Sequence, residues 1–262
     1  MRRTRVCAAA VVSTAVLIAL TGCGGDSGSP SGSTGGSTDN AAPASTTPEP
    51  APESSGPNDL GCLEADQLAG STTLALPDGM ETDAYLTGKG PVGVIFSHQV
   101  NLNACSWVPL ADQLAADGYQ ALAINSLSTE VDELVAGAKL LREKGAKKIV
   151  LIGASKGGTG SLAAAAVIEP PVSAVVSLSG PAEFGDLDAL AAVARLTMPV
   201  YLVVGRNDSR FFEDAEKLKK AATHSRDLKY EVIEGAEHGN SLLDEYPKTW
   251  ESVRAFIKKS AG

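Results

Sequence analysis

Short apolar runs rich in β-branched residues alternate along the chain with segments whose apolar residues recur at helical spacing. The alternation starts near residue 70 and continues to the C-terminus. It is typical of a mostly parallel sheet wound with crossover helices on both faces, an α/β fold. The runs that predict strands, the first two as an antiparallel start, are 72–76, 81–87, 92–98, 120–125, 148–152, 174–179, 199–204 and 229–233.

The segments between these runs predict the helices. Pro109 suits the first turn of one of them, and Thr129 with Asp132 approximates a capping box at the start of the next. The last helix places an apolar stripe on one face, as expected for packing against a sheet. The helices are expected at 109–118, at 129–145, after residue 155, near 186–196, at 213–222 and from 247 onward.

The first 22 residues have the order of charges and apolar residues of an export signal. Three arginines among the first five residues precede an uncharged apolar run, residues 6–20, which is too short for a comfortable membrane span. The sequence LTGC at residues 20–23 resembles the lipobox of bacterial lipoproteins, in which the cysteine is lipidated and starts the mature protein. The resemblance implies an extracytoplasmic lipoprotein anchored to the bacterial membrane at Cys23. A secreted protein with an incidental cysteine is the alternative.

The segment that follows the lipobox cysteine has the composition of a tether. From residue 24 to 57 it contains almost only glycine, serine, threonine, proline, alanine and acidic residues, which predicts disorder, so residues 23–57 form a lipidated linker. Residues 58–262 have the size of one domain. Removal of residues 1–22 takes away three arginines and no acidic residue, which moves the formal charge from −9 to −12. This charge argues against nucleic acid as a partner.

Two cysteines remain in the folded domain, Cys62 and Cys105, because Cys7 leaves with the signal and Cys23 carries the lipid. In an exported domain such a pair favours a disulfide that closes a long loop. Two separately buried thiols are the alternative.

The sequence GASKG at residues 153–157 follows the apolar run KKIVLI and opens an alanine-rich segment. A G-x-S-x-G pattern between a strand and a helix predicts a nucleophile elbow, in which the serine hydroxyl projects from the sheet and backbone N–H groups face a developing oxyanion. The strand and helix around Ser155 carry this prediction, because a glycine-rich chain produces the bare pattern by chance. A tight-turn serine without chemistry is the alternative.

An aspartate and a histidine follow later strands in the chain order of a Ser-Asp-His triad. Asp208 comes after PVYLVV and His238 after KYEVIE, so each lies just beyond the carboxyl end of a predicted strand, where active sites form in open α/β sheets. His238 would accept the Ser155 proton and Asp208 would orient the imidazole. From about residue 70 to the C-terminus this order resembles the α/β-hydrolase fold. The resemblance implies a carboxylic ester hydrolase.

The resemblance also implies an oxyanion hole. In α/β-hydrolases one donor is the backbone N–H after the nucleophile, here Lys156, and the second comes from the loop after the strand that ends at His98. Many members carry His-Gly in that loop, whereas this chain has Gln99 and Val100 after His98. Gln99 is therefore the first choice for the second donor and Val100 the alternative. The Lys156 side chain is expected to project into solvent rather than to steer anionic substrates.

Several residues have competing interpretations. Asp208 could cap a turn, while His98 lies in the oxyanion loop and His224 near a helix end, where a structural role is expected. Weaker candidates for the triad acid, none of them directly after a strand, are Asp186, Asp188 and Asp214. Aromatic residues that could line a pocket or simply pack at loop edges are Trp107, Phe184, Phe211 and Phe212.

Between residues 179 and 199, where many relatives insert a lid, this chain has room for only about one helix, so we expect no large lid domain and an open site. The chain thus resembles minimal, lidless α/β-hydrolases such as dienelactone-hydrolase-like proteins and small esterases. We expect a hydrolase of an extracytoplasmic ester, lactone or lipid, with no cofactor, no metal and a monomer favoured. Acyl transfer by the same triad and ligand binding on an inactive scaffold are the alternatives.

Overall fold

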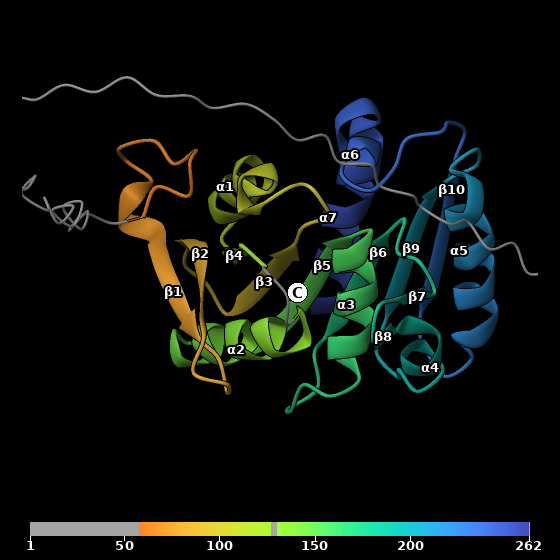
Figure 1. Ribbon diagram of the computed structural model, residues 1–262, viewed down its shortest axis with the longest axis horizontal. Helices are drawn as coiled ribbons and strands as arrows, with labels where there is room; N and C mark the ends of the chain where they lie inside the picture. The colour runs from red at the N-terminus through yellow and green to blue at the C-terminus, as the bar shows by residue number, and fades with distance from the viewer. Residues whose placement is uncertain (1–57, 127–129, 262) are drawn as a thin grey trace, which may run out of the picture. The chain divides into compact units, whose positions relative to one another are not determined.

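The computed structural model describes residues 58–126 and 130–261, and within them eight strands form one sheet (Figure 1). Across the sheet the strand order is β1-β2-β4-β3-β5-β6-β9-β10. The pairs β1/β2 and β2/β4 are antiparallel, and all the other neighbours are parallel. The strands are β1 (Ser71–Ala75), β2 (Glu81–Gly88), β3 (Val92–Ser97), β4 (Gln120–Ile124), β5 (Lys148–Ala154), β6 (Ala174–Leu178), β9 (Val200–Gly205) and β10 (Leu228–Ile233).

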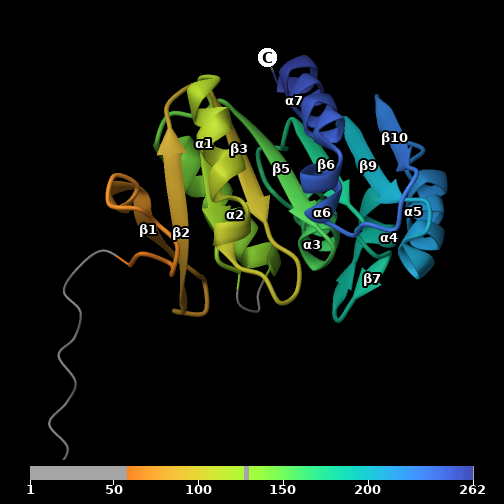
Figure 2. The same cartoon turned by 90° about the horizontal axis from the view of Figure 1, so that it is seen from above.

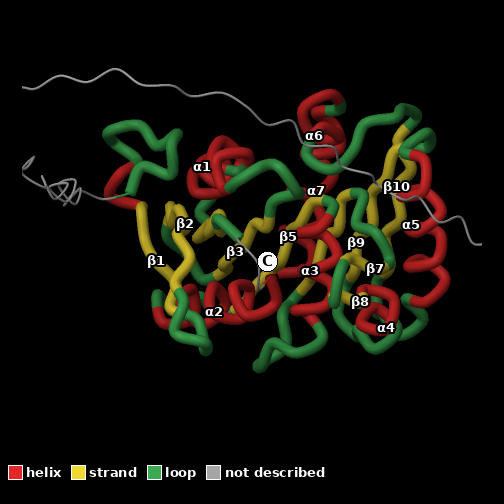
Figure 3. Tube along the Cα trace, in the orientation of Figure 1, coloured by secondary structure: helices red, strands yellow, loops and turns green. Residues whose placement is uncertain are grey.

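Helices cover both faces of the sheet (Figure 3). They are α1 (Val108–Ala116), α2 (Glu130–Glu143), α3 (Lys156–Ala165), α5 (Ser209–Ala221) and α7 (Pro247–Ala261). Helices α1 and α7 contribute to the same apolar cluster as Val94 and Val150, whereas α2, α3 and α5 share a cluster with Ile95 and Leu151. Side chains alternate between the two faces of a strand, so these pairs mark opposite faces of β3 and β5. Burial on both faces explains why the parallel strands have continuous apolar runs.

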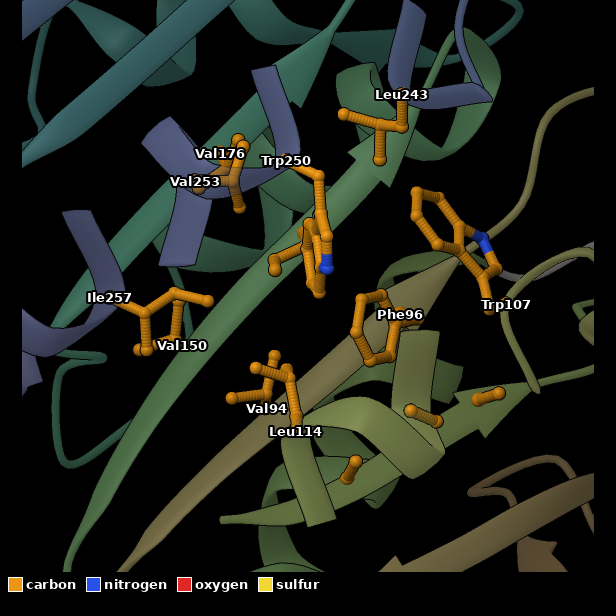
Figure 4. Close-up of a cluster of buried hydrophobic side chains, with 14 of the residues drawn as sticks. Val94, Phe96, Trp107, Leu114, Val150, Val176, Leu243, Trp250, Val253 and Ile257 are labelled. Atoms are coloured by element: carbon orange, nitrogen blue, oxygen red, sulfur yellow. The ribbon is translucent and has the colours of Figure 1, made fainter. Parts of the chain in front are cut away.

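The cluster under α1 and α7 joins residues that are far apart in the sequence (Figure 4). The ring of Phe96 on β3 stacks on Trp107 with 4.9 Å between the ring centroids, and both side chains are fully buried. Trp250 on α7 packs in the same cluster and donates its indole N–H to Gln113 on α1 at 2.8 Å. These contacts fix the end of β3 from which the predicted oxyanion loop departs.

The predicted strands and the main helices are present within a few residues of their expected positions. Helix α5 begins at Ser209 rather than near residue 213, directly after Asp208. Three short helical segments were not predicted: α6 (Ser241–Glu245) and the 3₁₀ turns η1 (Leu68–Gly70) and η2 (Ala104–Ser106). A segment of one turn is too short to show helical periodicity in a sequence. Thr129, the expected cap of α2, lies outside the described residues.

Between β6 and β9 the chain forms a hairpin of β7 (Glu183–Phe184) and β8 (Leu187–Asp188), followed by the short helix α4 (Ala189–Val193). The helix expected near 186–196 is therefore shorter than predicted, and its first residues belong to the hairpin. Gly185 occupies the turn with φ 56°, a conformation that glycine adopts without a steric penalty. This segment, which is described in full, contains no large lid domain, as the sequence predicted.

Cys62 and Cys105 form a disulfide, so the alternative of two separate thiols is wrong. The bond ties the segment before β1 to the turn η2, which follows the loop after β3. Among the described helices, none is both long enough and apolar enough to cross a bilayer.

Candidate active site

The turn at Ser155 connects β5 to α3 in a strained conformation. Ser155 has φ 48° and ψ −117°, outside the regions that residues with a side chain normally adopt. Such a conformation costs about 1–3 kcal/mol and persists only where the surroundings hold it. A Cβ on Gly153 would lie 2.0 Å from the carbonyl oxygen of Gly157, and one on Gly157 would lie 2.4 Å from that of Ser97. The two flanking glycines are thus required by close backbone contacts, which is the elbow geometry that the sequence predicted.

The residue directly after Ser155 carries an N–H group that can act as an oxyanion donor. The Ser155 N–H donates to the carbonyl of Leu178 at 2.8 Å, and the Ser155 carbonyl accepts from the Thr159 N–H at 3.0 Å. Lys156 is the first residue of α3, where an N–H group has no acceptor within the helix. The geometry therefore supports the Lys156 N–H as the first oxyanion donor.

Asp208 and His238 meet at the carboxyl edge of the sheet. Asp208 follows β9, His238 follows β10, and the Asp208 Oδ2 lies 2.8 Å from the His238 Nδ1. The Asp208 side chain is 7% exposed. Although Asp208 occupies the N-cap position of α5, its side chain makes no capping hydrogen bond. Its carboxylate is directed to the imidazole, so the capping interpretation is wrong.

The competing residues have other contacts. Asp188 caps α4 by accepting the Ala191 N–H at 2.7 Å, and Asp214 accepts from the Ala182 N–H at 3.2 Å and binds Lys217. His224 is exposed and its Nδ1 lies 2.8 Å from the carbonyl oxygen of Ala194, which agrees with the structural role expected for it. Asp186 borders a cavity described below rather than the His238 ring.

The loop that carries His238 packs against both the elbow and the predicted oxyanion loop. Gln99 accepts the Asn240 N–H on its Oε1 at 3.0 Å. A Cβ on Gly239 would lie 3.4 Å from the Cβ of Ala154, the residue before the serine. Within the described chain no hydrogen bond joins the Ser155 hydroxyl to His238. Catalytic hydrogen bonds are often long without substrate, so this arrangement is compatible with His238 as the base for Ser155.

Gln99 and Val100 take different positions in the predicted oxyanion loop. The Gln99 side chain accepts a hydrogen bond from the His238 loop, and the backbone carbonyl oxygen of Gln99 lies 2.9 Å from the Nδ1 of the buried His98. Val100 is exposed. The structure thus gives Gln99 the fixed position that an oxyanion donor needs, while its backbone N–H stays the preferred candidate rather than an observed donor.

The Lys156 side chain does not project into solvent as expected. Its Nζ lies 2.9 Å from the Oε2 of Glu130, and only 14% of the side chain is exposed. Glu130 begins α2, so the partner comes from an element well separated in the chain. Nothing in the sequence pattern pairs these two residues, and this contact is the main feature of the site that the sequence did not predict.

Two of the four aromatic candidates lie near residues of the site. The ring of Phe211 lies on the imidazole of His238 with 4.1 Å between centroids. Phe184 lines a cavity of about 400 Å³ together with Lys156 and Asp186. Trp107 belongs to the core, and Phe212 lies beside Arg206 with the guanidinium 5.5 Å from the ring centroid.

A hydrogen bond between a tyrosine and a carboxylate holds the His238 loop. The Tyr246 hydroxyl donates to the Oε2 of Glu237 at 2.8 Å, and this hydrogen bond lowers the pKa of Glu237 below its ordinary value. In the described part of the chain, no group of three or more His, Cys, Asp or Glu side chains is arranged to hold a metal ion.

Comparisons with known proteins agree with this architecture. Residues 124–245 match the model of the Dienelactone hydrolase family, and this range contains Ser155, Asp208 and His238. No curated protein sequence matches the chain.

Three similar solved structures are esterases or a dienelactone hydrolase. An esterase from Pyrococcus furiosus has a TM-score of 0.64 and 18% identity, over 73% of this chain and 91% of that one. A dienelactone hydrolase from Anabaena variabilis has a TM-score of 0.59 and 22% identity, over 72% and 94%. The esterase domain of a Rhodothermus marinus protein has a TM-score of 0.61 and 20% identity, over 73% and 98%. At these identities the structural likeness shows a shared fold, and it confirms the fold predicted from the sequence.

Proposed function

We propose that this member of the α/β-hydrolase superfamily, a carboxylesterase-like hydrolase, cleaves a carboxylic ester through an acyl-enzyme on Ser155. The observation that carries the proposal is the 2.8 Å contact between Asp208 and His238 at the sheet edge on which the strained Ser155 turn also lies. Figure 2 shows the loops that follow β3 and β6 on one edge of the sheet, where the carboxyl ends of the parallel strands meet.

The roles follow from the positions of the groups. Ser155 Oγ attacks the ester carbonyl carbon while His238 Nε2 takes the hydroxyl proton, and Asp208 holds the imidazole through Nδ1. The carbonyl oxygen becomes an oxyanion that accepts hydrogen bonds from the Lys156 N–H and from the loop at Gln99. The C–O bond to the alcohol breaks as His238 returns the proton to the leaving oxygen. Water, activated by His238 in the same way, then releases the acid and restores Ser155.

The substrate is proposed to be an ester, lactone or lipid outside the cytoplasm. Support comes from the arginines, apolar run and LTGC sequence of residues 1–23, which lie outside the described residues, and from the Cys62–Cys105 disulfide, a bond typical of exported proteins. Lipidation at Cys23 would anchor the enzyme to the bacterial membrane, with residues 23–57 as its tether. The short segment between β6 and β9 leaves the site open to substrates of varied size.

A panel of p-nitrophenyl esters of graded chain length, measured with the wild type and Ser155→Ala, tests the reaction. We expect hydrolysis by the wild type alone and labelling of the wild type alone by a fluorophosphonate. Equal labelling of both proteins would refute the Ser155 mechanism. Adding competing alcohols and following the products separates hydrolysis from acyl transfer, which the same triad could perform.

The anchor has a separate test. Radiolabelled palmitate should enter the wild type but not Cys23→Ala, and globomycin should block processing of the precursor. Secretion of an unlipidated wild-type protein would contradict the anchoring proposal without touching the esterase proposal.

A further inference from the structure

A buried carboxylate lies behind the elbow. Glu130 is 3% exposed and contacts three polar side chains: the Ser97 hydroxyl on Oε1, the Ser126 hydroxyl at 2.7 Å on Oε2, and the Lys156 ammonium at 2.9 Å on Oε2. A buried carboxylate is unfavourable unless it is paired and hydrogen-bonded, and here both oxygens are occupied. Its position in the first turn of α2 adds the favourable field of the helix N-terminus.

The backbone leaves space for this carboxylate. A Cβ on Gly160 of α3 would lie 2.1 Å from the Cγ of Glu130, so Glu130 reaches its position only because residue 160 has no side chain. Gly160 lies in α3, one turn after the elbow, where glycine is otherwise unfavourable to a helix. A side chain at residue 160 would therefore displace Glu130 from its buried position.

Two of the three partners belong to the two halves of the proposed oxyanion hole. Lys156 carries the backbone N–H that is the first donor. Ser97 is the last residue of β3 and directly precedes His98 and Gln99, the loop of the second donor. Strands β3 and β5 are neighbours, so the two halves come from adjacent strand ends, with Glu130 bonded to both.

We infer that Glu130 is a positioning residue that holds the two oxyanion donors in register through Lys156 and Ser97. The inference rests on the proposed esterase function. The Ser155 to Lys156 peptide is held at its carbonyl by Thr159 and at the Lys156 side chain by Glu130, and these two contacts fix the direction of the Lys156 N–H. Because the Ser155 backbone is strained, loss of the ion pair should let the peptide rotate toward a relaxed conformation.

The test compares Glu130→Gln and Lys156→Met with Lys156→Arg. We expect the first two variants to lower kcat by about 10–100-fold and to leave KM within about threefold, because a displaced donor weakens transition-state binding more than substrate binding. The double variant should be no slower than the slower single variant, since each single variant already removes the ion pair between Glu130 and Lys156. Lys156→Arg keeps the charge beside a cavity of about 400 Å³ and should retain most of the activity.

Two readouts separate positioning from lost stability. In the first readout, all rates are expressed per active site titrated with a fluorophosphonate. The second readout is the affinity for phenylboronic acid, which should fall in parallel with kcat. The tetrahedral adduct of this compound on serine places an oxygen in the oxyanion hole. The stability control is Gln120→Met. Gln120 is the first residue of β4, at the opposite end of the strands from the site, where it is buried and donates to the Gly90 carbonyl at 2.7 Å. That variant should lose stability with an unchanged kcat per site.

Two results with Lys156 variants would overturn the positioning role. One is a Lys156→Met variant with wild-type kcat and wild-type boronate affinity. The other is an equal loss of kcat in Lys156→Arg and Lys156→Met. The same holds if the loss in Glu130→Gln disappears once rates are expressed per titrated site. These outcomes are distinct from failure of the esterase proposal, because there Ser155→Ala would keep the wild-type activity and labelling.

Discussion

Replacing both cysteines of the disulfide, Cys62→Ser with Cys105→Ser, should lower the free energy of unfolding by about 4 kcal/mol. The bond links residues separated by 43 positions. In the chain-entropy model a loop of this length removes about 13 cal/mol/K from the unfolded chain, which corresponds to about 4 kcal/mol at 25 °C. For a domain of this size the same change lowers Tm by about 8–16 °C.

The activity of the folded variant should be preserved, because other contacts hold the segment around Cys105 in place. Asn103 accepts the Cys105 N–H at 3.0 Å, Asn125 accepts the Ala104 N–H at 3.3 Å, and Trp107 is fully buried against Phe96. We therefore expect kcat per folded molecule to stay within about twofold of the wild type, since the disulfide acts mainly on the unfolded chain.

Urea denaturation gives the free energy and the m-value of wild type, double variant and reduced wild type, and p-nitrophenyl acetate hydrolysis well below the transition gives kcat. The reduced wild type serves as the matched control and should behave like the double variant. A loss under about 1 kcal/mol with an unchanged m-value would refute the loop-entropy reasoning. A large decrease of kcat in a fully folded double variant would show instead that the disulfide positions the predicted oxyanion loop.

Three further predictions follow from particular contacts. Asp208→Asn should lower kcat by about 10⁴-fold, as in another Ser-His-Asp triad, with little change in urea stability because the Asp208 side chain makes no capping bond. Gly157→Ala should lower stability and esterase activity together, because its Cβ would lie 2.4 Å from the Ser97 carbonyl oxygen; a fully active, stable variant would contradict the close approach. All five tyrosines have raised pKa values from burial or a bonded carboxylate, Tyr85 to about 12. The unfolded chain loses these protons near pH 10, so stability should fall between about pH 10 and 12, measured by urea unfolding alongside phenolate absorbance.

The strands and main helices were predictable because their signals are local. A strand such as β5 is recognised from its continuous apolar run, and a helix such as α7 from one apolar face. The hairpin of β7 and β8 was missed because two-residue strands have no periodicity to read. The first residues of α5 were missed although Asp208 occupies the N-cap position, because the helix begins at Ser209 with a positive φ that no sequence pattern indicates.

The candidate site also contains residues that a local sequence signal predicts and contacts that no local signal predicts. Ser155, Asp208 and His238 could be proposed because each has a local mark: flanking glycines for the serine, and a preceding strand for the acid and the base. The bond from Gln99 to Asn240 spans 141 positions, and its partners carry no mark that connects them. The same is true of Phe211 on His238 and of Tyr246 on Glu237.

The sequence by itself determined the α/β alternation, the elbow and the chain order of the proposed triad residues, because periodicity, glycine spacing and strand ends are properties of neighbouring residues. The tertiary structure alone decided that Lys156 turns inward to Glu130 and that Ser97 shares this carboxylate. The physical reason lies in the sheet order, which places β3 between β4 and β5 and brings their carboxyl ends together. Because Glu130 is buried near those strand ends, its carboxylate is stable only with a cation close by, and Lys156 provides that cation despite its separation along the chain.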